Sequence, residues 1–319
     1  MKNGVKCLYT NTDTLHNKLD EIKLFVDKED IHFLAITETL SKSSIDCEPI
    51  FILPGFECIS NNGGRGVALF VKDGTEFTRI TDYDDIFSPS VVCHIKLPDV
   101  ESFILAVIYR SPNSGELENE NVYKFVSCIC KNHARDKIVI AGDFNYPDID
   151  WTNDICNKAD DHIASKFLPC TQENYLNQII ESPTHFRGNQ NPTLIDLILT
   201  NDVNFVQDLA FHPPFGKSHH VVLTFSIDLN PIYTEGDPIL KYQMNKGDYV
   251  QMKTYFSKVD WNDVTSDNNA LDDISERFVD VLNTARDQFV PKKFVRPNNT
   301  VRRTFTAPPT LLTALQLKR

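Results

Sequence analysis

The chain lacks several features that define well-known structural classes. No hydrophobic run among its 319 residues is long enough to span a membrane, and the N-terminus has no secretory leader. Its eight cysteines include no Cys-x-x-Cys pair, which argues against a structural zinc site or a disulfide scaffold. No internal repeat is present. These absences predict a globular protein with reduced thiols, nuclear or cytoplasmic rather than secreted and without a membrane partner.

Positive charge is also scarce, because the formal net charge is −12. A nucleic-acid-binding protein usually carries a basic surface, so at first sight this value argues against such a partner. Basic residues are nevertheless concentrated after Arg286. A divalent cation can also bridge an acidic site to a polyanion. The net charge therefore does not exclude nucleic acid as a partner.

Apolar strand-like runs alternate with amphipathic segments through the first part of the chain. Residues 103–109 and 138–141 are typical of buried strands, whereas the apolar spacing over 14–28 and 117–132 predicts helices. We expect a further helix over 172–180. This alternation predicts an α/β protein with mixed sheets.

The composition changes near residue 230, after which longer polar stretches surround a single expected helix at 272–288. We therefore predict one domain over residues 1–230 and a linker-like helical region over 231–290. Pro- and Asn-rich sequence follows, so residues 291–319 are expected to form a disordered basic tail.

The most informative stretch is residues 137–145. Gly142 ends the apolar strand, and Asp143 and Asn145 follow at once. A carboxylate can align or deprotonate a water, and an amide can donate to a phosphate, so this pair suits phosphate-ester hydrolysis. An ordinary Asp/Asn turn after a strand would look the same.

Other polar residues recur at the ends of expected strands, where a layered sheet would bring them to one crevice. Such a set offers oxygen ligands for Mg²⁺, a base, a phenol and an imidazole. It comprises Asn11, Asp13, Glu38, Tyr109, Arg110, Asp143, Asn145, Asp196, His219 and His220.

The order of these motifs resembles the endonuclease/exonuclease/phosphatase superfamily, and most closely the apurinic-type endonuclease domain of non-LTR retrotransposons. The signals are Asn11-x-Asp13, Thr-Glu38-Thr, Tyr109-Arg-Ser-Pro, Gly-Asp143-Phe-Asn, Leu-Ile-Asp196-Leu-Ile-Leu-Thr and Ser-His-His220. The resemblance implies a four-layer α/β sandwich, in which two packed mixed sheets are flanked by helices.

The resemblance also implies a role for each residue. Glu38 and Asn11 would hold Mg²⁺, with Mn²⁺ as an alternative, and Asp13 could join them. Asp143 would activate the water, Asn145 and Tyr109 would contact the scissile phosphate, and His220 would stabilise the transition state. Asp196 would orient the imidazole, and Arg110 would contact the DNA backbone.

Two departures qualify this resemblance. The family has Ser-Asp-His where this chain has Ser218-His219-His220, and a histidine cannot supply the negative charge of that aspartate. The aromatic-x-Asp-Asp tetrad of the associated reverse transcriptase does not occur either, which suggests a truncated element.

The sequence therefore predicts a Mg²⁺-dependent endonuclease domain that nicks DNA, derived from a truncated non-LTR retrotransposon. His219 motivates one alternative, a catalytically degenerate relic or weak nucleic-acid-binding module. A second alternative is a phosphatase or phosphodiesterase that acts on lipid or inositol phosphates.

Overall fold

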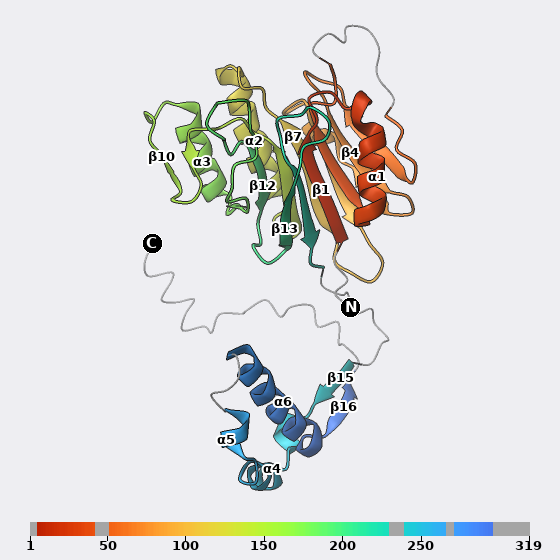
Figure 1. Ribbon diagram of the computed structural model, residues 1–319, viewed down its shortest axis with the longest axis vertical. Coiled ribbons are helices and arrows are strands. Elements are labelled where there is room, and N and C mark those ends of the chain that lie inside the picture. The colour runs from red at the N-terminus through yellow and green to blue at the C-terminus, as the bar shows by residue number, and fades with distance from the viewer. Residues whose placement is uncertain (1–4, 42–50, 230–238, 266–270, 296–319) are drawn as a thin grey trace, which may run out of the picture. The chain divides into compact units, whose positions relative to one another are not determined.

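The computed structural model describes residues 5–41, 51–229, 239–265 and 271–295. The chain divides into two compact units, Met1–Ile232 and Tyr233–Arg319. The larger unit contains two six-stranded sheets with helices on their outer faces (Figure 1). None of the helices within these ranges is long and apolar enough to cross a membrane.

The first sheet is built around the parallel pair β1 and β2, and its remaining neighbours pair antiparallel. Asn11 lies opposite Thr37, so β1 and β2 end at the same edge. In spatial order the strands are β13 (Val206–His212), β14 (Val222–Ile227), β1 (Val5–Asn11), β2 (Phe33–Thr37), β4 (Val67–Lys72) and β3 (Phe56–Asn61).

The second sheet has the same plan around the parallel pair β7 and β8. Asp143 lies opposite Tyr109 on one side and opposite Asp196 on the other, which gathers three polar residues at one edge. In spatial order the strands are β11 (Asn177–Gln178), β12 (Asp196–Thr200), β8 (Lys137–Asp143), β7 (Phe103–Tyr109), β6 (Ser90–Lys96) and β5 (Glu76–Arg79).

Three apolar clusters hold the layers together. The two sheets pack face to face through side chains such as Phe33 and Phe103, whose rings are 5.9 Å apart. The helix α1 (Leu19–Glu29) covers the outer face of the first sheet. The helices α2 (Glu116–Asn132) and α3 (Ile163–Glu173) cover the second (Figure 1). The predicted four-layer α/β sandwich is confirmed, and central strands such as β7 are apolar throughout because both of their faces are covered.

The helix expected over 172–180 is wrong. The helix α3 already contains the first of these residues and ends at Glu173. Tyr175 then has a φ of +55°, which a helix cannot contain, and β11 pairs antiparallel with β12. Short elements complete the larger unit: β9 (Ile149–Asp150), β10 (Ile155–Cys156), and the 3₁₀ helices His16–Lys18 and Thr81–Tyr83.

The smaller unit contains a two-stranded sheet and three helices. Its elements are β15 (Ile239–Tyr242), the 3₁₀ helix Met244–Lys246, α4 (Tyr249–Phe256), α5 (Trp261–Val264), α6 (Leu271–Phe289) and β16 (Lys292–Val295). Residues 292–295, which we expected in a disordered tail, instead form β16, because β15 offers them an antiparallel partner. Residues 296–319 of that expected tail lie outside the described residues.

Candidate active site

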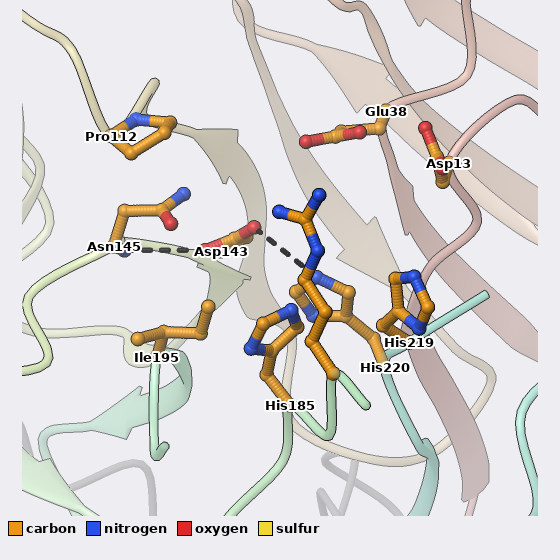
Figure 2. A pocket seen from close by; sticks show the side chains of 10 residues that line it. Asp13, Glu38, Pro112, Asp143, Asn145, His185, Ile195, His219 and His220 are labelled. Atoms are coloured by element: carbon orange, nitrogen blue, oxygen red, sulfur yellow. Dashed lines mark hydrogen bonds and ion pairs between the residues drawn. The ribbon is translucent and has the colours of Figure 1, made fainter. Parts of the chain in front are cut away.

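The polar strand ends converge on one pocket of about 330 Å³. The parallel pairs β1–β2 and β7–β8 explain this, because the carboxyl ends of both pairs reach the same side of the sandwich. Six of the predicted site residues line the pocket: Asp13, Glu38, Asp143, Asn145, His219 and His220 (Figure 2).

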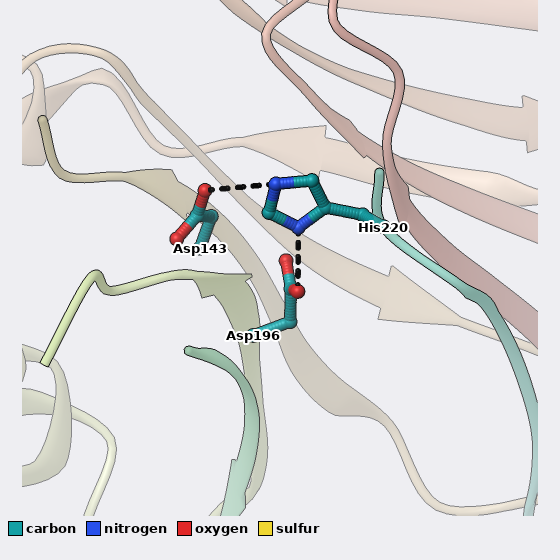
Figure 3. A group of neighbouring side chains, drawn as sticks. All are labelled: Asp143, Asp196 and His220. Atoms are coloured by element: carbon teal, nitrogen blue, oxygen red, sulfur yellow. Dashed lines mark hydrogen bonds and ion pairs between the residues drawn. The ribbon is translucent and has the colours of Figure 1, made fainter. Parts of the chain in front are cut away.

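A buried hydrogen-bonded group lies at the base of this pocket. Nδ1 of His220 is 2.7 Å from Oδ2 of Asp196, and Nε2 of His220 is 4.0 Å from Oδ2 of Asp143 (Figure 3). A carboxylate only accepts hydrogen bonds, so Nδ1 carries the proton that is shared with Asp196. The other nitrogen is thereby directed toward Asp143.

Asp196 is itself held in place by Tyr9 of the opposite sheet and by Thr184 of the loop before β12. The hydroxyl of Tyr9 donates to Oδ1 of Asp196 at 2.7 Å, and the backbone N–H of Asp196 donates to the hydroxyl of Thr184 at 3.1 Å. A carboxylate within an apolar strand needs such partners. Sequence reasoning missed Tyr9 and Thr184, since nothing in their local pattern distinguishes them from ordinary strand and loop residues.

The charges of this group depend on one another. Burial lowers the pKa of His220, but the charge and hydrogen bond of Asp196, with Asp143 and Glu38, outweigh it and raise this pKa to about 9. Burial and the charge of Asp196 raise the pKa of Asp143, and the imidazolium opposes them. His220 is therefore a cation at neutral pH, and Asp143 is the better proton acceptor.

Asp143 is fixed by two neighbours. The side-chain amide of Asn11 donates to its Oδ2 at 2.9 Å, and the backbone N–H of Asn145 donates to its Oδ1 at 3.2 Å. The side-chain amide of Asn145 donates to the carbonyl of Arg110 at 2.7 Å. The carboxylate is therefore preorganised at the wall of the pocket.

Glu38 and Asp13 lie across the pocket from Asn145 (Figure 2). Nη2 of Arg65 is 2.7 Å from Oε2 of Glu38 and 2.6 Å from Oδ1 of Asp13. Tyr109 is almost fully buried, and burial together with Glu38 raises the pKa of its phenol. Sequence reasoning missed Arg65, because nothing in its local pattern relates it to Glu38 or Asp13.

Arg110 does not reach the pocket, so the predicted contact with DNA is wrong. Its side chain is fully buried and donates to Oδ1 of Asn119 at 2.6 Å and to the carbonyl of Asn145 at 2.9 Å. Its guanidinium also lies 4.3 Å from the ring centre of Tyr146. Arg110 therefore fixes the chain around Asn145 from beneath.

A histidine-rich wall faces the carboxylates. The ring centre of His185 is 4.7 Å from that of His220 and 6.2 Å from that of His219, and His185, His219 and Arg187 all line the pocket. Sequence reasoning assigned no role to His185 or Arg187. Both follow Thr184, whose carbonyl and N–H pair with Val221 and Thr193, and this pairing brings them to the site.

Two groups of side chains offer ligand atoms for a metal. Single atoms of Asp143, Asp196 and His220 all lie within 4.8 Å of one another, but the hydrogen bond to Asp196 already uses Nδ1 of His220. Glu38 and Asp13 each provide a carboxylate oxygen, and both oxygens contact the same atom, Nη2 of Arg65. This all-oxygen donor set suits Mg²⁺ better than the first group does.

Residues 103–224 match a family model described as endonuclease-reverse transcriptase. Among solved structures, the chain resembles the endonuclease domain of TRAS1, a telomere-specific non-LTR retrotransposon. The two share 14% identity with a TM-score of 0.54, over 70% of this chain and 98% of that one. The chain has the DNase I-like fold. This confirms the resemblance to the endonuclease/exonuclease/phosphatase superfamily.

Two further DNase I-like structures are similar over most of their length. The AP endonuclease LMAP from Leishmania major has 13% identity and a TM-score of 0.54, over 70% of this chain and 88% of that one. The catalytic domain of Xenopus laevis APE2 has 15% identity and a TM-score of 0.52, over 72% and 94%. No curated protein sequence matches the chain. The DNase I-like fold of this chain is therefore related to those of retrotransposon and AP endonucleases.

Proposed function

We propose that the larger unit is a Mg²⁺-dependent endonuclease that nicks DNA, of the kind that non-LTR retrotransposons carry. The observation that carries the proposal is a preorganised, buried Asp143 that faces His220 in a pocket also lined by Glu38 and Asp13. A base, an imidazolium and a set of oxygen donors in one pocket suit phosphodiester hydrolysis.

In this proposal the chain's own residues divide the work. Asp143 accepts a proton from the water that attacks phosphorus, and Asn11 keeps that carboxylate in position. His220, held by Asp196, is a charged donor for the phosphate as the bond to the leaving oxygen breaks. Asn145 would contact the phosphate from the wall opposite Glu38, and the phenol of Tyr109 would do so from beside Glu38.

Glu38 and Asp13 would hold the divalent cation, with Asn11 beside them. When bound, the cation neutralises charge on the phosphate and on the leaving oxygen. The carbonyl oxygen of the Asn11 side chain already accepts the backbone N–H of Asp13 at 2.9 Å, so Asn11 also orders the loop that carries this ligand.

The test is nicking of supercoiled plasmid by the full-length protein, with Mg²⁺ or with a chelator. Asp143→Asn should lower the rate at least a hundredfold, because it removes the proton acceptor while keeping the side chain's shape. Asp73→Asn, at an exposed turn of the same unit, is the control and should leave the rate unchanged. Equal rates for wild type and Asp143→Asn would contradict the proposal, as would cleavage of inositol phosphates with DNA left intact.

His219 favours one second candidate, a catalytically degenerate module that binds nucleic acid weakly. His219 lines the pocket. The motif that Ser218-His219-His220 resembles has an aspartate at this position. Binding of DNA without nicking by wild type, together with nicking by His219→Asp, would support this second candidate.

A further inference from the structure

Arg65 is held beside Glu38 by the backbone around it. Arg65 lies in the turn between β3 and β4, and its carbonyl accepts the N–H of Leu40 at 2.9 Å. The carbonyl of Gly66 accepts the N–H of Thr39 at 3.3 Å. Gly66 has a φ of +74°, and a Cβ there would lie 2.4 Å from Oγ1 of Thr39. Only glycine allows this approach, so the turn is fixed against the segment that follows Glu38.

The guanidinium of Arg65 bridges two carboxylates with a single nitrogen. Nη2 is 2.7 Å from Oε2 of Glu38 and 2.6 Å from Oδ1 of Asp13, and the side chain is only 14% exposed. Within the described part of the chain, Nε and Nη1 are buried and donate to no acceptor. Arg65 therefore gives up much of its hydration in order to make these two contacts.

We propose that Arg65 is a tethered competitor of the divalent cation, which can bind Glu38 and Asp13 only when the guanidinium withdraws. This inference rests on the proposed function, in which Glu38 and Asp13 hold a divalent cation. The two oxygens that would ligate the cation are those that contact Nη2: Oδ1 of Asp13 accepts its hydrogen bond, and Oε2 of Glu38 forms an ion pair with it. A cation placed between them would also meet the positive charge of the guanidinium.

The competition has a measurable size. Binding of the cation must break a charge-assisted hydrogen bond to Asp13 and an ion pair to Glu38, which weakens the apparent affinity for the metal by roughly 10- to 100-fold. Removal of Arg65 should restore that affinity. Removing a different positive charge from the pocket should increase the affinity for the metal by a smaller factor. Water and salt screen a charge that does not contact the two carboxylates directly.

The experiment measures Mn²⁺ binding by the full-length protein, with free Mn²⁺ quantified by electron paramagnetic resonance. Arg65→Gln should bind Mn²⁺ roughly 10- to 100-fold more tightly than wild type. The matched control is Arg187→Gln, which removes a positive charge from the same pocket but leaves the Arg65–Glu38 contact in place. It should gain less than about threefold.

A second measurement needs no variant. In wild-type protein, the Nε–H resonance of Arg65 should shift as Mg²⁺ is added, because the guanidinium leaves its two carboxylates. An unchanged resonance would overturn the inference. So would equal Mn²⁺ affinities for wild type and Arg65→Gln, or no Mn²⁺ binding by either.

The plasmid assay separates this inference from the proposed function. A gain in Mn²⁺ affinity in Arg65→Gln, without nicking by any of the proteins, would support the competition and contradict the nuclease. Nicking that depends on Asp143, with unchanged Mn²⁺ affinity in Arg65→Gln, would support the nuclease and overturn the competition.

Discussion

Asp196→Asn removes a negative charge from the base of the pocket while keeping the shape of the side chain. In the wild type this carboxylate is 2.7 Å from Nδ1 of His220, and both groups are buried. Its charge and hydrogen bond are the main reasons why the pKa of His220 rises despite the burial of the ring. The substitution should therefore lower the pKa of His220.

The magnitude follows from the shift of that pKa, from 6.5 to about 9. A rise of this size corresponds to about 3 kcal/mol of stabilisation when the imidazole is protonated. Because the pKa is raised in the folded state, the stabilisation is fully present below pH 6.5. It is lost as the pH rises through about 9.

The assay is urea unfolding of the full-length protein at pH 6.5 and pH 9.5, with the resonances of His220 followed by NMR over the same range. Wild type should lose up to about 3 kcal/mol more than Asp196→Asn between these two pH values. Asp136→Asn, which removes the carboxylate 3.1 Å from Nδ1 of His133, is the control. That pair is more exposed, so its effect should stay below about 1 kcal/mol. A wild-type His220 that titrates near its ordinary value would refute the reasoning.

Three further predictions concern the scaffold and the pocket. Arg110→Ala should lower the free energy of unfolding by about 3–5 kcal/mol in urea titrations, because it leaves Asn119 without its charged donor; a loss below about 1 kcal/mol would contradict this. Phe167→Ala should cost about 3–5 kcal/mol in the same assay, since its ring stacks on Tyr146 at 4.4 Å within the second cluster; full stability would show that the cluster can close the cavity. His219→Asp should increase plasmid nicking, because it restores a negative charge to the pocket; a lower rate would contradict the role assigned to this position.

The layers of the sandwich could be predicted because their signal is local. Strands such as β7 and β8 are apolar on both faces, and the helices between them repeat apolar residues at helical spacing. The polar residues that end these strands could likewise be assigned to one edge. Asp143 and His220 lie together in the structure, as we expected from the polar residues at the strand ends.

The partners of those residues could not be predicted, because they come from the other sheet or from distant loops. The Tyr-Arg-Ser-Pro motif does not indicate whether the side chain of Arg110 points outward to solvent or inward to Asn119, which it contacts in the structure. Arg65 comes after Glu38 in the chain with strand β3 between them, and the backbone hydrogen bonds of Thr39 and Leu40 with Gly66 and Arg65 bring the two side chains together. The orientation of a side chain at a strand end is decided by tertiary packing.

The bonds that prepare the candidate site also join the two sheets. Asn11 to Asp143, Tyr9 to Asp196 and His220 to Asp196 each connect the first sheet with the second, at the rim of an otherwise apolar interface. The same few contacts therefore order the candidate site and hold the two sheets together. A substitution that removes one of these contacts should therefore weaken the proposed hydrolysis and the stability of the sandwich together.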